Sequence, residues 1–203
     1  MKKNSLSTLL PALCALLLAG CAPAPKNAEA ARSGPIVCFG DSVTAGLGVE
    51  TSQAYPALLA QLTGRRVVNA GVSGDTTEDA LARLGNDVLA LRPGLVVIEI
   101  GGNDYLKQVP FEQTKRNIDD IIGRIQASGA MAAVVDPGGA VLLRNYSAAF
   151  QEITDRREAL FLKHLLGDVL SRPSLKTDPI HPNNAGHKKL ADGIYAGIKK
   201  YLK

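Results

Sequence analysis

The strongest constraint on the fold is a set of short apolar segments that alternate along the chain with amphipathic stretches. We expect strands at Ile36–Phe39, Val67–Ala70, Leu95–Ile100 and Ala130–Val135, with a weaker one at Leu160–Leu162. Strands that are apolar along their whole length are typical of a sheet covered on both faces, and strands that alternate with helices are typical of parallel βαβ units. The pattern therefore predicts an α/β fold, a three-layer α/β/α sandwich with a mostly parallel, flavodoxin-like sheet of five strands.

Between these strands, apolar residues recur at helical spacing. We expect helices at Tyr55–Leu62, Thr114–Ser128 and Asn184–Tyr201, and over residues 76–91 and 145–159. The chain has 203 residues and 46% hydrophobic residues, which suits one full-sized domain with a real core. We place that domain at residues 35–203.

The first residues are typical of an export signal. Met1-Lys2-Lys3 precedes an apolar run that is too short to cross a membrane comfortably. The ending Leu18-Ala19-Gly20-Cys21 resembles a bacterial lipobox, which implies that residues 1–20 are a lipoprotein signal peptide and that Cys21 is lipidated. The protein would then be anchored by lipid in the bacterial cell envelope, on the periplasmic face. Ala22 after the cysteine favours the outer membrane, and the alternative is an ordinary signal peptide.

Residues 21–34 are rich in alanine and proline without an apolar period, so we interpret them as a lipidated tether. The cysteines agree with this organisation. Cys14 would leave with the signal, Cys21 would carry lipid, and Cys38 lies inside an apolar strand and would be a buried free thiol. The chain therefore has no disulfide framework.

Several function classes lack support. The formal charge is +4 without a basic block, and aromatic residues make up 4%, so we expect no nucleic-acid partner. The sequence has no metal-ligand spacing of the HExxH or paired-cysteine kind, and no glycine-rich phosphate loop. We expect no metal and no cofactor.

Polar clusters follow the first three strands. They comprise Asp41 and Ser42, then Ser73, Gly74 and Asp75, then Gly101, Gly102, Asn103 and Asp104. Because ligands bind outside the carboxyl ends of parallel strands, these clusters should converge where chemistry is expected.

A serine becomes a nucleophile when a neighbouring base takes its proton. The chain has three histidines, and His181 lies in the stiff segment DPIHPNNAG with Asp178 three residues before it. Asp178 could orient the imidazole so that its other nitrogen faces Ser42, as a triad requires. The alternative is a helix-entry loop in which Asp178 caps the helix. We interpret His164 and His187 as surface or packing residues.

An oxyanion hole needs donors aimed at the developing negative charge. Gly74 offers an unhindered backbone N–H, Asn103 a side-chain amide and Ser42 its own N–H. The alternatives are ordinary tight turns at the glycines and a turn-stabilising contact at Asn103. Ser73 half matches the G-x-S-x-G nucleophile pattern, but Asp75 stands at the last glycine, so Ser73 is not our candidate.

Four motifs appear in order: GDSVTAG at 40–46, NAGVSGD at 69–75, GGND at 101–104 and DPIHP at 178–182. They resemble the four blocks of the SGNH (GDSL-type) hydrolases, and the resemblance covers nearly all of residues 35–203. It is greatest to the small bacterial thioesterase, lysophospholipase and arylesterase branch, which has a similar segment to Tyr55-Pro56-Ala57-Leu58-Leu59. The resemblance implies Ser42 as nucleophile, Asp178 with His181 as the acid–base pair, and Gly74 and Asn103 as oxyanion donors.

The implied activity is hydrolysis of acyl esters, thioesters or lysophospholipids by a monomer. The stretch around Asp136-Pro137-Gly138-Gly139 departs from the family pattern in the loop that borders the acyl pocket. In the loop at 136–147, Val141-Leu142-Leu143 favours an acyl groove, and the alternative is helix packing. Two other functions stay open: a carbohydrate O-acetylesterase acting on cell-wall or exported glycan, and a non-catalytic envelope lipoprotein that binds glycan or partners.

Overall fold

The computed structural model describes residues 23–138 and 143–203. Its five strands are all parallel, in the order β2-β1-β3-β4-β5. They are β1 (Ile36–Gly40), β2 (Val67–Gly71), β3 (Leu95–Glu99), β4 (Met131–Val135) and β5 (Leu160–Leu162). This confirms the predicted flavodoxin-like sheet, because that fold has the strand order 2-1-3-4-5.

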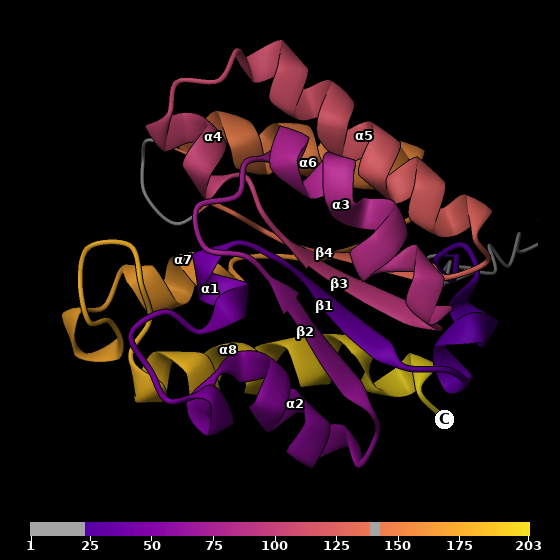
Figure 1. The fold of residues 1–203 in the computed structure, drawn as a ribbon, viewed down its shortest axis with the longest axis horizontal. Helices are drawn as coiled ribbons and strands as arrows, with labels where there is room; N and C mark the ends of the chain where they lie inside the picture. Colours follow the sequence, from indigo (N-terminus) through magenta and orange to yellow (C-terminus); the bar gives the residue numbers. More distant parts are fainter. Residues whose placement is uncertain (1–22, 139–142) are drawn as a thin grey trace, which may run out of the picture.

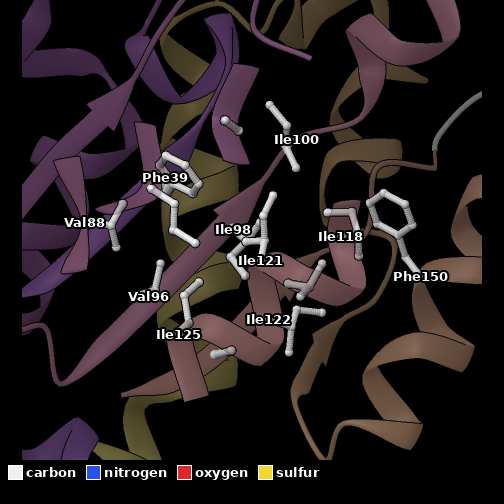
Figure 2. Close-up of a cluster of buried hydrophobic side chains, with 14 of the residues drawn as sticks. Phe39, Val88, Val96, Ile98, Ile100, Ile118, Ile121, Ile122, Ile125 and Phe150 are labelled. Carbon is white, nitrogen blue, oxygen red and sulfur yellow. The ribbon is translucent and has the colours of Figure 1, made fainter. Parts of the chain in front are cut away.

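Helices cover both faces of the sheet, as predicted (Figure 1). One layer consists of α3 (Thr77–Asp87), α5 (Phe111–Ala127) and α6 (Arg144–Arg156), and the other contains α2 (Tyr55–Thr63) and α8 (Asn184–Ile198). Side chains alternate between the two layers along each strand. In β3, Val96 and Ile98 join the first core, which Figure 2 shows packed around Ile121 and Phe39, whereas Leu95 and Val97 join the second.

Three short helices follow strands β1, β3 and β5 and were not predicted. They are α1 (Ser42–Ala45), α4 (Gly102–Leu106) and α7 (Leu165–Leu170). Each is too short to display the recurrence of apolar residues on which a helix prediction depends. All three lie at the end of the sheet where β1 and β3 finish (Figure 1), and they build the rim of the candidate site.

The other differences concern helix ends and short 3₁₀ turns. The helix expected over 76–91 ends at Asp87 and continues as the 3₁₀ turn η3 (Leu89–Leu91), and α8 passes into η6 (Lys199–Tyr201). Further 3₁₀ turns are η2 (Thr51–Gln53) and η5 (Pro173–Leu175). Cys38 is a free, buried cysteine, as predicted.

The predicted tether is partly built into the domain. Residues Ala28–Arg32 form the 3₁₀ helix η1, and Ala31 is buried in the second core. The Lys26 N–H donates to the Glu158 carbonyl, and the Asn27 amide donates to the carbonyls of Gln126 and Ala130. These bonds hold the segment although its composition is typical of a linker.

The predicted signal peptide and the lipidation site Cys21 lie outside the described residues. Within residues 23–138 and 143–203, no helix has the length and apolar character needed to cross a membrane.

The ends of β1 and β3 meet at the switch point of the sheet, where ligands bind in folds of this type. Gly40, the last residue of β1, makes this close approach possible. A Cβ atom at Gly40 would lie 2.0 Å from the Glu99 carbonyl oxygen and 2.4 Å from Thr44 Oγ1. Only glycine therefore fits where α1 turns back over the sheet.

Candidate active site

Ser42 begins α1 directly after β1 and is 8% exposed. The preceding residue, Asp41, caps this helix because its side chain accepts a hydrogen bond of 3.0 Å from the Val43 N–H. A capped turn at the end of a buried strand holds the Ser42 hydroxyl in a fixed direction at the edge of the sheet.

His181 reaches Ser42 from the loop before α8. The distance from Ser42 Oγ to His181 Nε2 is 2.9 Å, although the two residues are 139 positions apart. On the other side of the ring, His181 Nδ1 lies 2.7 Å from Asp178 Oδ2. The side chains of Ser42, His181 and Asp178, which the sequence analysis expected to act together, are therefore in contact.

Asp178 is held by the backbone of its own loop. Its Oδ1 atom accepts hydrogen bonds of 2.9 Å from the backbone N–H groups of Ile180 and His181. The hydrogen bond from His181 keeps the pKa of Asp178 below its usual value, so the carboxylate stays ionised. Asp178 does not cap α8, because that helix is capped by Asn183, whose side chain accepts from Gly186 N–H. The alternative role considered for Asp178 is therefore wrong.

This order of groups has a definite chemical capacity. An ionised carboxylate at Nδ1 favours the tautomer that carries its hydrogen there, which leaves Nε2 free to accept the proton of the serine hydroxyl. A serine in such a contact can attack an electrophilic carbonyl carbon.

Asn103 lies in α4, next to the turn that carries Ser42. Its side-chain amide donates to Asp41 Oδ2 at 3.3 Å and to the Asp75 carbonyl at 3.0 Å. Gly74 has a φ of +87°, in the left-handed region that favours glycine, and its carbonyl accepts a 2.7 Å bond from Lys107 Nζ. Asn103 thus bridges the segments that follow β1 and β2.

A cavity of about 160 Å³ opens beside Ser42, Asn103 and His181. Most of its wall is apolar, with aliphatic side chains from Val43, Leu106, Leu143, Leu166, Leu170 and Ile180. Gly74 is not among its lining residues. Of the apolar stretch expected to form an acyl groove, Leu143 lines the cavity, whereas Val141 and Leu142 lie outside the described residues.

Sequence reasoning missed Leu166 and Leu170 of α7 and the buried Glu99, which also line this cavity. The one available signal for Glu99 was an acidic residue inside the otherwise apolar run LVVIEI. Of the remaining histidines, His187 is fully buried in the packing of α8, and His164 is exposed. In the part of the chain that the structure describes, no cluster of three or more His, Cys, Asp or Glu could hold a metal ion.

Three curated relatives match between 68% and 93% of the chain. Esterase TesA from Pseudomonas aeruginosa is 33% identical over 93% of this chain and 99% of its own length. The thioesterase 1/protease 1/lysophospholipase L1 of Escherichia coli K12 is 30% identical over 81% of this chain and 83% of its own. An acetylxylan esterase from Geobacillus stearothermophilus is 30% identical over 68% of this chain and 71% of its own.

A solved structure agrees with these relatives. The crystal structure of TesA superimposes with a TM-score of 0.76 at 30% identity, covering 83% of this chain and 99% of that one. The model of the GDSL-like Lipase/Acylhydrolase family matches residues 38–189, a range that contains the strand-one serine and the loop of His181. On the fold, the matched range and these relatives, the chain belongs to the GDSL-like lipase/acylhydrolase family, the SGNH hydrolases.

Proposed function

We propose that the protein hydrolyses carboxylic esters through a triad of Ser42, His181 and Asp178. Membership in the family makes the chain an SGNH-type esterase; the roles of the individual residues are our proposal. The observation that carries it is the contact of 2.9 Å between Ser42 Oγ and His181 Nε2.

In the proposed reaction, His181 takes the hydroxyl proton as Ser42 Oγ forms a bond to the acyl carbon. The bond from that carbon to the leaving oxygen or sulfur then breaks, and His181 returns the proton to the departing alcohol or thiol. Water, activated by His181, hydrolyses the acyl-enzyme and releases the carboxylic acid. Asp178 keeps its hydrogen bond to Nδ1 throughout and stabilises the imidazolium that forms.

The negative oxygen of the tetrahedral intermediate needs nearby donors. We assign this role to the backbone N–H groups of Ser42 and Gly74 and to the amide of Asn103. Asn103 lines the cavity beside Ser42, which supports its role. Its two amide hydrogens donate to Asp41 and to the Asp75 carbonyl in the free protein, so the longer bond, of 3.3 Å to Asp41, has to give way when the oxyanion forms. The role of Gly74 is supported by its position directly before Asp75, whose carbonyl accepts a hydrogen bond from the Asn103 amide.

Acyl esters are the favoured substrate class, with thioesters and lysophospholipids as further candidates. The aliphatic wall of the cavity supports an apolar acyl group, because burying such a group releases about 0.8 kcal/mol for each CH₂. A carbohydrate O-acetylesterase is the second candidate, since an acetylxylan esterase is among the relatives. A panel of p-nitrophenyl esters of increasing chain length, run beside acetylated xylo-oligosaccharide, distinguishes them by kcat/KM.

A fluorophosphonate probe tests the nucleophile. The purified protein should be labelled, and Ser42→Ala should lose both labelling and ester hydrolysis while keeping its circular dichroism spectrum. Ser73→Ala is the matched control, because Ser73 follows the neighbouring strand and should leave labelling unchanged. Labelling that persists in Ser42→Ala, or a wild-type protein that hydrolyses no ester, would contradict the proposal.

We further infer that the mature protein is a monomer that begins at a lipidated Cys21 in the cell envelope. The lipobox-like ending Leu18-Ala19-Gly20 before this cysteine supports the inference. Mass spectrometry of the N-terminal peptide from membranes tests it: a Cys21→Ser variant should lose the added lipid mass, and an unmodified Cys21 would exclude lipidation.

A further inference from the structure

Beneath Ser42 lies a connected set of buried polar side chains that do not belong to the proposed triad. Glu99, the last residue of β3, is 3% exposed, and Thr44 and Tyr55 are fully buried. The Thr44 hydroxyl donates to Glu99 Oε2 at 2.9 Å. Tyr55 OH lies 2.9 Å from Thr44 Oγ1 and must be the donor there, because the single hydroxyl hydrogen of Thr44 already points to Glu99.

Glu99 lies beside Asp41, which is 4% exposed: the Asp41 N–H donates to the Glu99 backbone carbonyl at 3.3 Å, and both residues line the same cavity. Their two carboxyl groups form a hydrogen-bonded pair. Two carboxylates in such contact cannot both be ionised in an apolar environment, so one of them carries a proton. Asp41 accepts from the Val43 N–H and from the Asn103 amide, and both donors favour its ionised form. Glu99 accepts from the Thr44 hydroxyl through Oε2 and also from the Thr44 backbone N–H, but burial and the charge of Asp41 outweigh these two donors, so Glu99 carries the proton.

The electrostatics agree with this assignment. Burial, and then the charge of Asp41, raise the pKa of Glu99 well above its usual value. Burial also raises the pKa of Asp41, but only to about 6, because the Val43 N–H and the Glu99 hydrogen bond favour its ionised form. The nearby titratable groups are Tyr55 from α2, Asp75, and His181 from the loop before α8. At neutral pH the pair therefore consists of a neutral Glu99 and an ionised Asp41.

We propose that Glu99, in its protonated form, is a positioning residue of this active site: its O–H holds Asp41, and Asp41 in turn holds the Asn103 amide and the turn that carries Ser42. This inference rests on the proposed function. Ionisation of Glu99 would place a second negative charge beneath the site where the oxyanion develops. A neutral Glu99 thus serves both geometry and charge.

Two substitutions separate this role from simple filling of the core. Glu99→Gln keeps an NH₂ that can donate to Asp41 and an oxygen that can accept from Thr44, so its kcat for p-nitrophenyl acetate at pH 8 should stay within about threefold of wild type. Glu99→Met keeps the volume but removes both hydrogen bonds, and its kcat should fall by about 10- to 100-fold with KM nearly unchanged. Should Glu99→Met fail to fold, Glu99→Asp replaces it, because the shorter side chain draws the carboxyl away from Asp41, and the same loss is expected.

Infrared spectroscopy reports the proton directly. The difference spectrum of wild type minus Glu99→Gln at pH 8 should contain the C=O stretch of a protonated carboxylic acid, shifted in deuterium oxide. Absence of that band, or a loss of kcat in Glu99→Gln as large as in Glu99→Met, would overturn the proposal, as would wild-type kcat in Glu99→Met. If instead Ser42→Ala retained hydrolysis, the proposed function would fail while the infrared result still decided the state of Glu99.

Discussion

Asp178 accepts three hydrogen bonds, from the N–H groups of Ile180 and His181 and from His181 Nδ1. In Asp178→Asn the remaining oxygen can keep the two backbone bonds, but an NH₂ group then faces Nδ1. The ring should switch to the tautomer with its hydrogen on Nε2, which cannot take the Ser42 proton. Because Asp178 is 44% exposed and water can partly replace it, we expect kcat to fall by roughly 10²- to 10⁴-fold.

The measurement is the initial rate of p-nitrophenyl acetate hydrolysis at saturating substrate. Asp192→Asn is a suitable control, because Asp192 pairs with Lys188 on the exposed face of α8 and should leave the rate unchanged. A rate for Asp178→Asn equal to that of the control would exclude Asp178 from the reaction.

His187 lies fully buried against Tyr55, and its Nδ1 accepts a 3.2 Å bond from the Tyr55 N–H. Its Nε2 has no partner among the described residues. Burial lowers the pKa of His187 to about 4, below the ordinary value of ~6.5. Protonation would also place a hydrogen on Nδ1, where it would face the Tyr55 N–H donor.

This shift predicts a pH-dependent stability. Between pH ~6.5 and 4 the unfolded chain binds more protons at His187 than the folded one, so the free energy of unfolding falls as the pH falls through this window, by about 3 kcal/mol in total. His187→Asn keeps an acceptor for the Tyr55 N–H without titrating, and it should lose that much less stability between pH 7 and 4. Urea unfolding at several pH values measures the difference.

Asp119 provides the matched control. Its hydrogen bonds to Arg157 hold the pKa of Asp119 at about 2, so its contribution to stability is lost below pH ~3.9, outside the His187 window. Asp119→Asn should therefore leave the pH dependence above pH 4 unchanged. If wild type and His187→Asn lost stability in parallel, the neutral state of His187 would not be the cause.

At the scale of elements, α7 determines part of the cavity wall. Its Leu166 and Leu170 are one helical turn apart and both line the cavity. Leu166 is also part of the buried core, whereas Leu170 is only partly buried and can be enlarged with less damage. Leu170→Phe should narrow the cavity and lower kcat/KM for p-nitrophenyl octanoate about tenfold relative to acetate.

The ratio of the two kcat/KM values is the readout, since a general loss of folding lowers both together. Leu62→Phe, at an exposed position on α2, should leave the ratio as in wild type. An unchanged ratio in Leu170→Phe would show that the acyl chain does not enter this cavity.

The elements also differ in how well the sequence predicts them. Strands β1 to β5 were predicted to within one residue. The central strands β1, β3 and β4 are buried along their whole length and therefore appear as nearly continuous apolar runs, whereas β2 and β5 are only partly buried and gave shorter apolar runs. Helices α1, α4 and α7 were not, since a helix of four to six residues has at most two turns in which to repeat an apolar position. Their positions depend on the end of the sheet over which they turn.

The site follows the same rule. The contact between Asp178 and His181 is local, so spacing alone made it plausible. To predict the contact between Ser42 and His181, the parallel sheet and the family resemblance were both needed, because the two residues are 139 positions apart. Glu99 escaped prediction because only the alternation of β3 places it on the face of Tyr55 and Thr44, away from Ile98.

At the scale of the whole molecule, the beginning of the described chain lies near the starts of the strands, whereas α1 and α4, which carry residues of the candidate site, lie near the opposite ends of the strands (Figure 1). The Lys26 N–H donates to the carbonyl of Glu158, two residues before β5 begins. The Asn27 amide donates to the carbonyl of Ala130, directly before β4, and to that of Gln126 in the last turn of α5. Ser42 and Asn103 instead follow the ends of β1 and β3. A strand of five residues such as β1 is about 17 Å long, so the two ends of the sheet are at least that far apart.

The placement of the chain start and the site at opposite ends of the strands predicts which way the site faces if Cys21 carries lipid. Cys21 is five residues before Lys26, so the connecting chain spans at most about 18 Å and cannot lead around the domain. The lipid would hold the starts of the strands toward its own membrane, and Ser42 would face away from it. The lipidated protein in vesicles should then hydrolyse a soluble ester as fast as Cys21→Ser does, but a lysophospholipid in the same bilayer only slowly.

Lengthening the tether gives the decisive comparison. Twenty Gly/Ser residues inserted before Lys26 allow the domain to turn over, because a flexible linker of that length has an end-to-end distance of about 25 Å. Hydrolysis of the lysophospholipid in the same bilayer should then rise several-fold, while the rate on the soluble ester stays constant and serves as the control for intact catalysis. Rapid hydrolysis with the natural tether and no gain from the insertion would mean that the site already reaches the anchoring membrane, and the orientation deduced from η1 and β1 would be wrong.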